Sequence, residues 1–150
     1  MQLHLWRKTI AKRLILIEAG FWLLTSRFLL AFMPFPRLMQ LLAHPPRRPA
    51  TQATIRARHR QQVRQAIYLL RRRFGKQTTC LHRAIAAQMM LQRRGVSTTL
   101  YFGAIRQPQQ GLTLHAWVKD GEEGVVGYRA TQKERYHLVA RYPTIEQTTV

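Results

Sequence analysis

Residues 78–95, TTCLHRAIAAQMMLQRRG, carry the signals for both ends of one helix, around which we expect the rest of the chain to pack. Thr78 or Thr79 can cap the start by accepting a hydrogen bond from a free backbone N–H. The two arginines before Gly95 suit the negative end of the helix dipole, and Gly95 supplies the left-handed residue that ends such helices. Cys80 therefore falls in the first turn, where the dipole favours a thiolate. Taken alone, a single cysteine is more often a small buried apolar residue.

Composition restricts the class of protein. The 150 residues are 46% hydrophobic, which suits one domain with a real core. A single cysteine excludes an internal disulfide and a multi-cysteine metal site, and it suits a reducing cytoplasm. The 25 Lys and Arg against 6 Asp and Glu give a net charge of +19, which predicts an acidic partner: nucleic acid, an anionic membrane surface or an acidic peptide.

The N-terminal stretch, residues 6–34, predicts a long apolar helix. Glu18 and Arg27 interrupt it, and this disfavours both a transmembrane span and a signal peptide. We expect a largely buried helix. In an alternative arrangement the helix lies on a membrane surface. Its basic residues then face the headgroups, and its two tryptophans lie in the interface: Arg7, Lys8, Lys12 and Arg13 for the first, Trp6 and Trp22 for the second.

The rest of the chain changes from helical to strand patterns. A short helix is predicted over 37–43, a proline-rich linker over 44–49, and an amphipathic helix from a Thr51 cap to Phe74, whose arginines are expected to form a solvated face. Strands are predicted over 96–105, 112–118, 124–128 and 136–142, with a turn at Asp120-Gly121 and a ragged tail. The predicted class is α+β, with N-terminal helices and a cysteine-bearing helix packed on a small antiparallel sheet.

Cys80 and His115 form the candidate catalytic pair. His115 lies within an apolar strand, and on a strand packed against the helix start its imidazole could deprotonate the thiol. The thiolate would attack an acyl carbon, with the Cys80 N–H and the Gln77 side chain as oxyanion donors. Strand alternation places Trp117 on the same face as His115, which makes Trp117 a candidate substrate-binding residue. Gln77 is the second candidate, as an oxyanion donor. His82 points away around the helix, as a surface or supporting residue.

No cofactor or metal is expected. The sequence has no phosphate-binding glycine motif, and its histidines and single cysteine show no zinc spacing.

Several motifs, in order and spacing, make the sequence resemble the lasso-peptide leader peptidases of the transglutaminase-like (papain-like) cysteine protease superfamily. They are Glu18-Ala19 through Leu29-Leu30 with Pro34-Phe35, Cys80 to Ala86, Leu91 to Gly95 followed by Thr99-Leu100, and His115-Ala116-Trp117-Val118 with Gly127. The resemblance implies one protease domain over 1–150 with a helical extension over 1–50. Cys80 would be the nucleophile and His115 the general base and acid.

The same resemblance implies a function and partners. The enzyme would remove the leader from a ribosomally made lasso precursor before macrolactam cyclisation. A small leader-recognition protein would hold the leader, and a separate ATP-dependent cyclase would use the freed amine. The single cysteine indicates the cytoplasm as the location, the N-terminal helix leaves contact with the inner membrane surface as an option, and no specific nucleic acid is expected as a partner.

The third member of the triad departs from the family pattern. The family places an acid on the strand after the histidine, and the aligned position near Gly127 has no carboxylate. Asp120 is the nearest downstream acid, but five residues along a strand place it roughly 16 Å away. Because the third group only orients the imidazole, a backbone carbonyl or a neutral side chain could replace it.

Two other function classes stay open from sequence. One is a non-catalytic basic protein that binds nucleic acid or an anionic membrane, with Cys80 and His115 in its core, although no nucleic-acid-binding motif is recognisable. The other is an acyl transferase using the same pair, because water and an amine differ only as acceptors of the acyl-enzyme.

Overall fold

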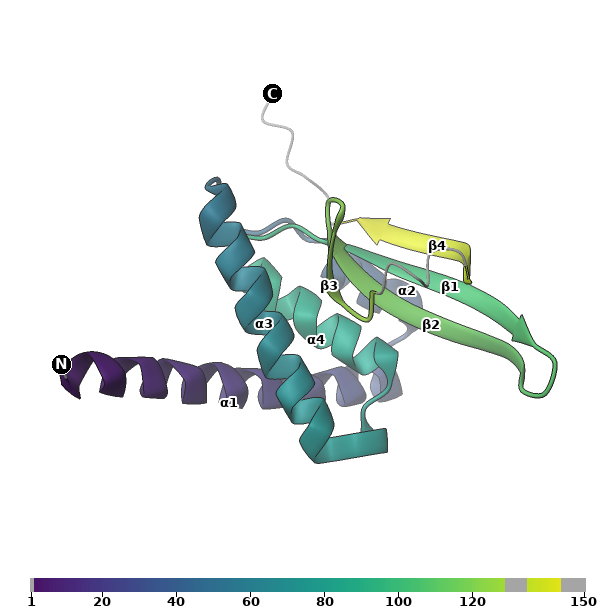
Figure 1. Ribbon diagram of the computed structural model, residues 1–150. Helices are drawn as coiled ribbons and strands as arrows, with labels where there is room; N and C mark the ends of the chain where they lie inside the picture. The colour runs from purple at the N-terminus through teal and green to yellow at the C-terminus, as the bar shows by residue number, and fades with distance from the viewer. Residues whose placement is uncertain (1, 129–134, 144–150) are drawn as a thin grey trace, which may run out of the picture.

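The computed structural model describes residues 2–128 and 135–143, in which helices precede a four-stranded sheet (Figure 1). The elements are α1 (Gln2–Phe32), α2 (Phe35–Leu42), α3 (Ala53–Phe74), the 3-10 turn η1 (Gly75–Gln77), α4 (Cys80–Arg93), β1 (Thr99–Gln107), β2 (Gly111–Asp120), β3 (Glu123–Val126) and β4 (His137–Pro143). The strands lie in the order β3-β2-β1-β4, and all neighbours are antiparallel. The predicted α+β class is confirmed.

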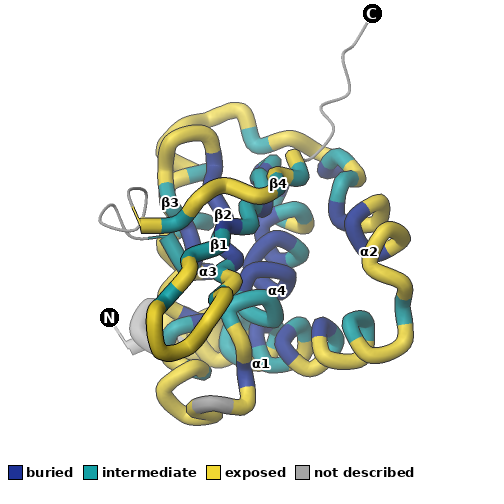
Figure 2. Tube along the Cα trace, turned by 90° about the vertical axis from the view of Figure 1, so that its right-hand side faces the viewer, coloured by how far each residue is buried: buried dark blue, intermediate teal, exposed yellow. Residues whose placement is uncertain are grey.

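Helix α4 lies at the centre of the core, in contact with α1, α3 and the sheet. The largest fully buried side chains include Ile85, Met90 and Leu91 of α4. Figure 2 shows buried stretches along α4 and the adjoining part of the sheet, and shorter ones on α1 and α2. Burying one such side chain contributes about 1.5 to 3 kcal/mol. The helix that carries Cys80 is therefore fixed in place by the core itself.

Both predicted ends of α4 are present. Thr79 is the N-cap: its Oγ1 accepts from the His82 N–H at 3.4 Å, and the Thr79 N–H donates to His82 Nδ1 at 3.1 Å. His82 thus closes a capping box. At the other end Gly95 has φ +78°, and its carbonyl accepts from the Ala50 N–H at 2.8 Å. A side chain at Gly95 would collide with the Arg48 carbonyl, so glycine is required there.

Strand β2 alternates its faces as expected. Ala116 and Val118 are buried beneath α4, whereas His115 and Trp117 lie on the opposite face, half-buried. The register with β1 places Gly103 opposite His115. Gly103 marks both an irregularity and a close packing point, because the β1–β4 register shifts beside it and its backbone packs against Trp117.

Several predicted boundaries shift. Gln52, not Thr51, occupies the N-cap position of α3, without a side-chain capping hydrogen bond, and β1 begins at Thr99 rather than at residue 96. Within the expected apolar stripe of α3 only the middle is buried: Val63 is fully buried, whereas Phe74 is 50% exposed, because packing is concentrated around the middle of the helix. The predicted tail beyond residue 143 lies outside the described residues.

The prediction that α1 is largely buried is wrong. One side, with Ala19 and Leu23 buried, packs on α3 and α4. The other side carries large apolar side chains at three- and four-residue spacing, between 44% and 82% exposed: Ile10, Leu14, Ile17, Phe21, Leu24, Phe28 and Phe32. A helix that is apolar all round needs partners on all sides, and within the described part of the chain only one side has them.

The charge that interrupts α1 has a partner. Glu18 accepts from Arg94 at 2.6 and 2.9 Å, and Arg93 lies 3.7 Å away, so the acid ties α1 to the end of α4. In length and composition Arg7–Phe32 is the one candidate membrane span among the described residues. Of the two proposed interfacial tryptophans, Trp22 is half-buried against the core, and the side chain of Trp6 lies outside the described part.

Candidate active site

Cys80 is the first residue of α4 and lies at an open edge of the sheet. β3 pairs with β2 only over Val118 to Asp120, so the preceding part of β2 has no strand on that side among the described residues. The start of α4 meets β2 there, and the half-buried thiol stays accessible. Cys80 therefore lies where the N-terminus of α4 meets a part of β2 that is not paired with β3.

The structure brings Cys80 and His115 into contact. The thiol lies beside the His115 imidazole and the Ala116 backbone N–H, close enough for hydrogen bonds that favour the thiolate. Burial opposes ionisation of the thiol, but these two hydrogen bonds and the charges of His115 and Arg83 outweigh it, so the pKa of Cys80 lies below its ordinary value. The bond to Cys80 raises the pKa of His115, against the effect of burial. Both shifts favour a thiolate–imidazolium pair.

A backbone carbonyl occupies the third position. His115 Nε2 lies 2.7 Å from the carbonyl oxygen of Gly127. A carbonyl only accepts, so Nε2 carries the proton, and Nδ1 is left to exchange a proton with Cys80. This bond also helps to raise the pKa of His115. The Gly127 carbonyl, close to the position at which the family's acid aligns, therefore lies where it can orient the imidazole.

Gly127 is required at this position for two reasons. Its φ is +75°, a backbone conformation that side chains disfavour. A Cβ there would also lie 2.7 Å from the Ala116 carbonyl oxygen and 3.3 Å from Trp117 Cα. Only a residue without a side chain lets the backbone come close enough to β2 for its carbonyl to meet His115.

Asp120, the weak sequence candidate for this role, is engaged elsewhere. Its buried carboxylate accepts from Arg60 at 2.5 Å and from Arg56, both on α3. Arg64 adds a bond to the Val125 carbonyl at 2.9 Å. Asp120 therefore fastens α3 to the β2–β3 turn. The expectation of a wholly solvated arginine face on α3 is wrong at these three arginines.

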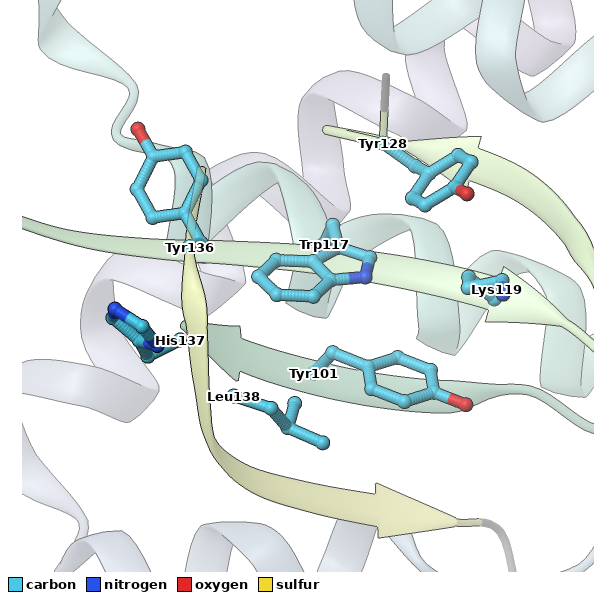
Figure 3. Close-up of a pocket in the computed structure, with 7 residues that line it drawn as sticks. All are labelled: Tyr101, Trp117, Lys119, Tyr128, Tyr136, His137 and Leu138. Carbon is cyan, nitrogen blue, oxygen red and sulfur yellow. The ribbon is translucent and has the colours of Figure 1, made fainter. Parts of the chain in front are cut away.

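The remaining predicted site residues lie around the pair. Gln77 is exposed at the end of η1, three residues before Cys80. Trp117 stacks against His115 with ring centroids 5.8 Å apart, and it lines a pocket (Figure 3). His82 belongs to the helix cap, as a supporting residue. Sequence reasoning did not find Ala116 N–H or Tyr136, whose ring lies 5.2 Å from that of His115.

The geometry suits acyl transfer through a thiolate. A thiol lies at a helix N-terminus, the Nδ1 atom of an imidazole faces it, and a backbone carbonyl fixes the other side of that imidazole, which is the arrangement that such chemistry needs. Among residues 2–128 and 135–143 no three His, Cys, Asp or Glu side chains gather closely enough to hold a metal ion.

Comparison with known proteins agrees with this geometry. A family model described as the transglutaminase-like superfamily matches residues 22–141, from the middle of α1 into β4, and includes Cys80, His115 and Gly127. No curated protein and no solved structure gives a significant match. The superfamily generally carries Cys-His chemistry, with which the single Cys80 is compatible. The chain therefore belongs to the transglutaminase-like superfamily.

Proposed function

We propose that this protein is a cysteine protease that removes the leader peptide from a lasso-peptide precursor before cyclisation. The observation that carries the protease part is the Cys80 thiol held between the His115 imidazole and the Ala116 N–H, with Gly127 behind the imidazole. The motif resemblance from α1 to Gly127 supports the finer substrate assignment.

The proposed reaction uses these groups in turn. The Cys80 thiolate attacks the carbonyl carbon of the scissile bond. The resulting oxyanion accepts hydrogen bonds from the Cys80 backbone N–H and from the Gln77 side chain. His115 then protonates the leaving amine, which is the new N-terminus of the core peptide. In the second half His115 takes a proton from water, the hydroxide attacks the acyl carbon, and the thiolate leaves. The Gly127 carbonyl keeps the imidazole oriented through both halves.

Two partners belong to this proposal. A small recognition protein would hold the leader, and an ATP-dependent cyclase would consume the freed amine. With a net charge of +19, the protein should attract an acidic leader. This attraction should weaken as salt rises, because ordinary ionic strength screens exposed charges over about 8 to 10 Å.

The test is cleavage of the precursor, followed by mass spectrometry, with the purified chain and the recognition protein. Cys80→Ala and His115→Ala should lose cleavage, and His44→Ala, at an exposed histidine outside the site, should retain it. Undiminished cleavage by Cys80→Ala refutes the mechanism. A product that carries an added amine in place of water identifies an acyl transferase instead.

For location, we propose that α1 rests on an anionic membrane surface at the cytoplasmic side. The exposed apolar row of α1 supports this, since seven large side chains point away from the core. Exposed cations flank the row at Arg7 and Arg13, which suits anionic headgroups. Binding to nucleic acid is less favoured, because Arg56, Arg60 and Arg64 of the most basic helix are used in internal contacts.

Vesicle co-sedimentation tests the location. The chain should bind phosphatidylglycerol-containing vesicles more strongly than pure phosphatidylcholine vesicles. Ile17→Ser with Phe21→Ser should reduce binding without loss of folding, since both side chains are more than half exposed. If that double variant binds as well as the unaltered chain, the apolar row does not contact the membrane.

A further inference from the structure

A pocket of about 360 Å³ opens on the face of the sheet opposite α4. Its walls are mainly aromatic, with one lysine, one exposed histidine and one aliphatic side chain (Figure 3): Tyr101, Trp117, Tyr128, Tyr136, Lys119, His137 and Leu138. All four aromatic residues are half-buried, so part of each remains in contact with water. Covering this aromatic surface with a ligand would be favourable, because it removes apolar surface from water. The hydrophobic core does not cover this surface, and the proposed acid–base exchange between Cys80 and His115 does not require it.

The pocket starts at the catalytic pair. The His115 ring lies 5.8 Å from Trp117 and 5.2 Å from Tyr136, both of which line the pocket. Trp117 is two residues beyond His115 on β2, about 6.6 Å along the strand. An extended peptide repeats its side-chain direction over the same distance. A substrate side chain within two residues of the scissile bond can therefore reach the indole ring.

The walls are preorganised. Trp117 and Tyr101 are stacked with centroids 5.7 Å apart and an interplanar angle of 6°. The Trp117 ring lies directly over Gly103, where a Cβ would come within 2.8 Å of the indole and of Tyr136 Cβ. Gly103 thus makes the room in which the indole lies flat. A flat wall of this kind suits another aromatic ring by stacking.

Lys119 gives the pocket its charge. Its side chain is only 10% exposed, and its Nζ lies 5.0 Å from the Tyr128 ring centroid and 5.8 Å from that of Tyr101. Its acidic partner, Glu122 at 3.2 Å, is 94% exposed and so compensates the charge weakly. A lysine or arginine side chain entering the pocket would meet this ammonium with little screening.

We propose that the pocket is a substrate subsite that binds an aromatic side chain within two residues of the scissile bond and rejects basic side chains through Lys119. The subsite rests on the proposed function only in that its ligand is a peptide that reacts at Cys80.

Peptidyl chloromethyl ketones test the subsite without the natural substrate. The Cys80 thiolate displaces chloride from the probe, forming a carbon–sulfur bond, and intact-mass spectrometry gives the rate. Probes carry Phe, Ala or Lys at the first or the second residue from the ketone. Each rate is divided by the rate with iodoacetamide, which reports Cys80 reactivity alone.

At one of the two positions the Phe probe should react at least about tenfold faster than the Ala probe, the effect of burying and stacking one ring. The Lys probe should react no faster than the Ala probe. Trp117→Ala should abolish the Phe advantage, and Lys119→Met should bring the Lys probe above the Ala probe. Leu112→Ala, at an exposed residue on the other face of β2, is the matched control and should change neither ratio.

Equal normalised rates for Phe and Ala probes at both positions in the unaltered chain overturn the subsite, whether or not the Trp117 variant folds. Failure of the proposed function would look different. In that case iodoacetamide itself would react with the pH dependence of an ordinary thiol, and His115→Ala would not alter it.

Discussion

Replacement of Gly127 by alanine tests the proposal that its backbone carbonyl orients His115 in place of a carboxylate. The new Cβ would lie 2.7 Å from the Ala116 carbonyl oxygen, so the Gly127 backbone must move away from β2. Its carbonyl, 2.7 Å from His115 Nε2, would move with it. The variant should therefore lose the hydrogen bond that orients the imidazole.

The expected effect follows from that bond. A hydrogen bond to a charged group contributes about 1.5 to 3 kcal/mol, which corresponds to roughly a 10- to 150-fold loss of rate. The bond also supports the raised pKa of His115, which falls without it. Less imidazolium then stabilises the thiolate, so the pKa of Cys80 rises. The rate of alkylation by iodoacetamide at pH 6 should fall about tenfold or more, and its pH curve should move to higher pH.

A matched control separates this effect from backbone strain. Gly121 has φ +58° and open space where a Cβ would be. Gly121→Ala should lose only the strain energy, about 1 to 2 kcal/mol, or a few degrees in Tm, and should keep the alkylation curve. Gly127→Ala should lose more stability because overpacking adds about 1 to 3 kcal/mol. A Gly127→Ala protein with the Tm of the control and an unaltered alkylation curve would refute the role of the carbonyl.

Three further outcomes are expected. Asp120→Asn should lower stability by about 3 kcal/mol, since two arginines lose a buried carboxylate, and should leave iodoacetamide alkylation unchanged; a shifted alkylation curve would restore Asp120 to the site. Glu18→Gln should cost about 1 kcal/mol at pH 7 in thermal melts. Burial opposes ionisation of Glu18, but Arg94 and Arg93 lower its pKa below 4.5. The stability difference between the unaltered chain and the variant should therefore persist below pH 4.5 and disappear only as the pH falls through the pKa of Glu18 in the folded state. A stability difference that does not depend on pH would contradict the ion pair. His115→Ala should move the alkylation curve of Cys80 to higher pH, and an unmoved curve would show that the imidazole does not stabilise the thiolate.

The sequence alone determined the elements whose signals are local. The threonine pair Thr78-Thr79 and Gly95 mark the two ends of α4, so Cys80 had to fall in a first turn, and the structure identifies Thr79 as the cap. The alternation of apolar residues in β2 placed His115 and Trp117 on one face. Such signals lie within a few residues of the feature that they predict. They can be interpreted from sequence because the periods of 3.6 residues in a helix and 2 in a strand determine which neighbouring residues share a face.

Which distant surfaces meet could be learned only from the folded molecule. The pairing of Asp120 with Arg56 and Arg60 joins residues 60 or more positions apart, and no periodicity encodes it. The exposed side of α1 likewise depends on how far α3 and α4 reach around it. Gly127 shows most clearly what sequence cannot predict. Every residue has a backbone carbonyl, so nothing in the sequence marks the one that meets His115. It meets His115 only because β3 ends at Val126 and a left-handed glycine then brings the backbone against β2.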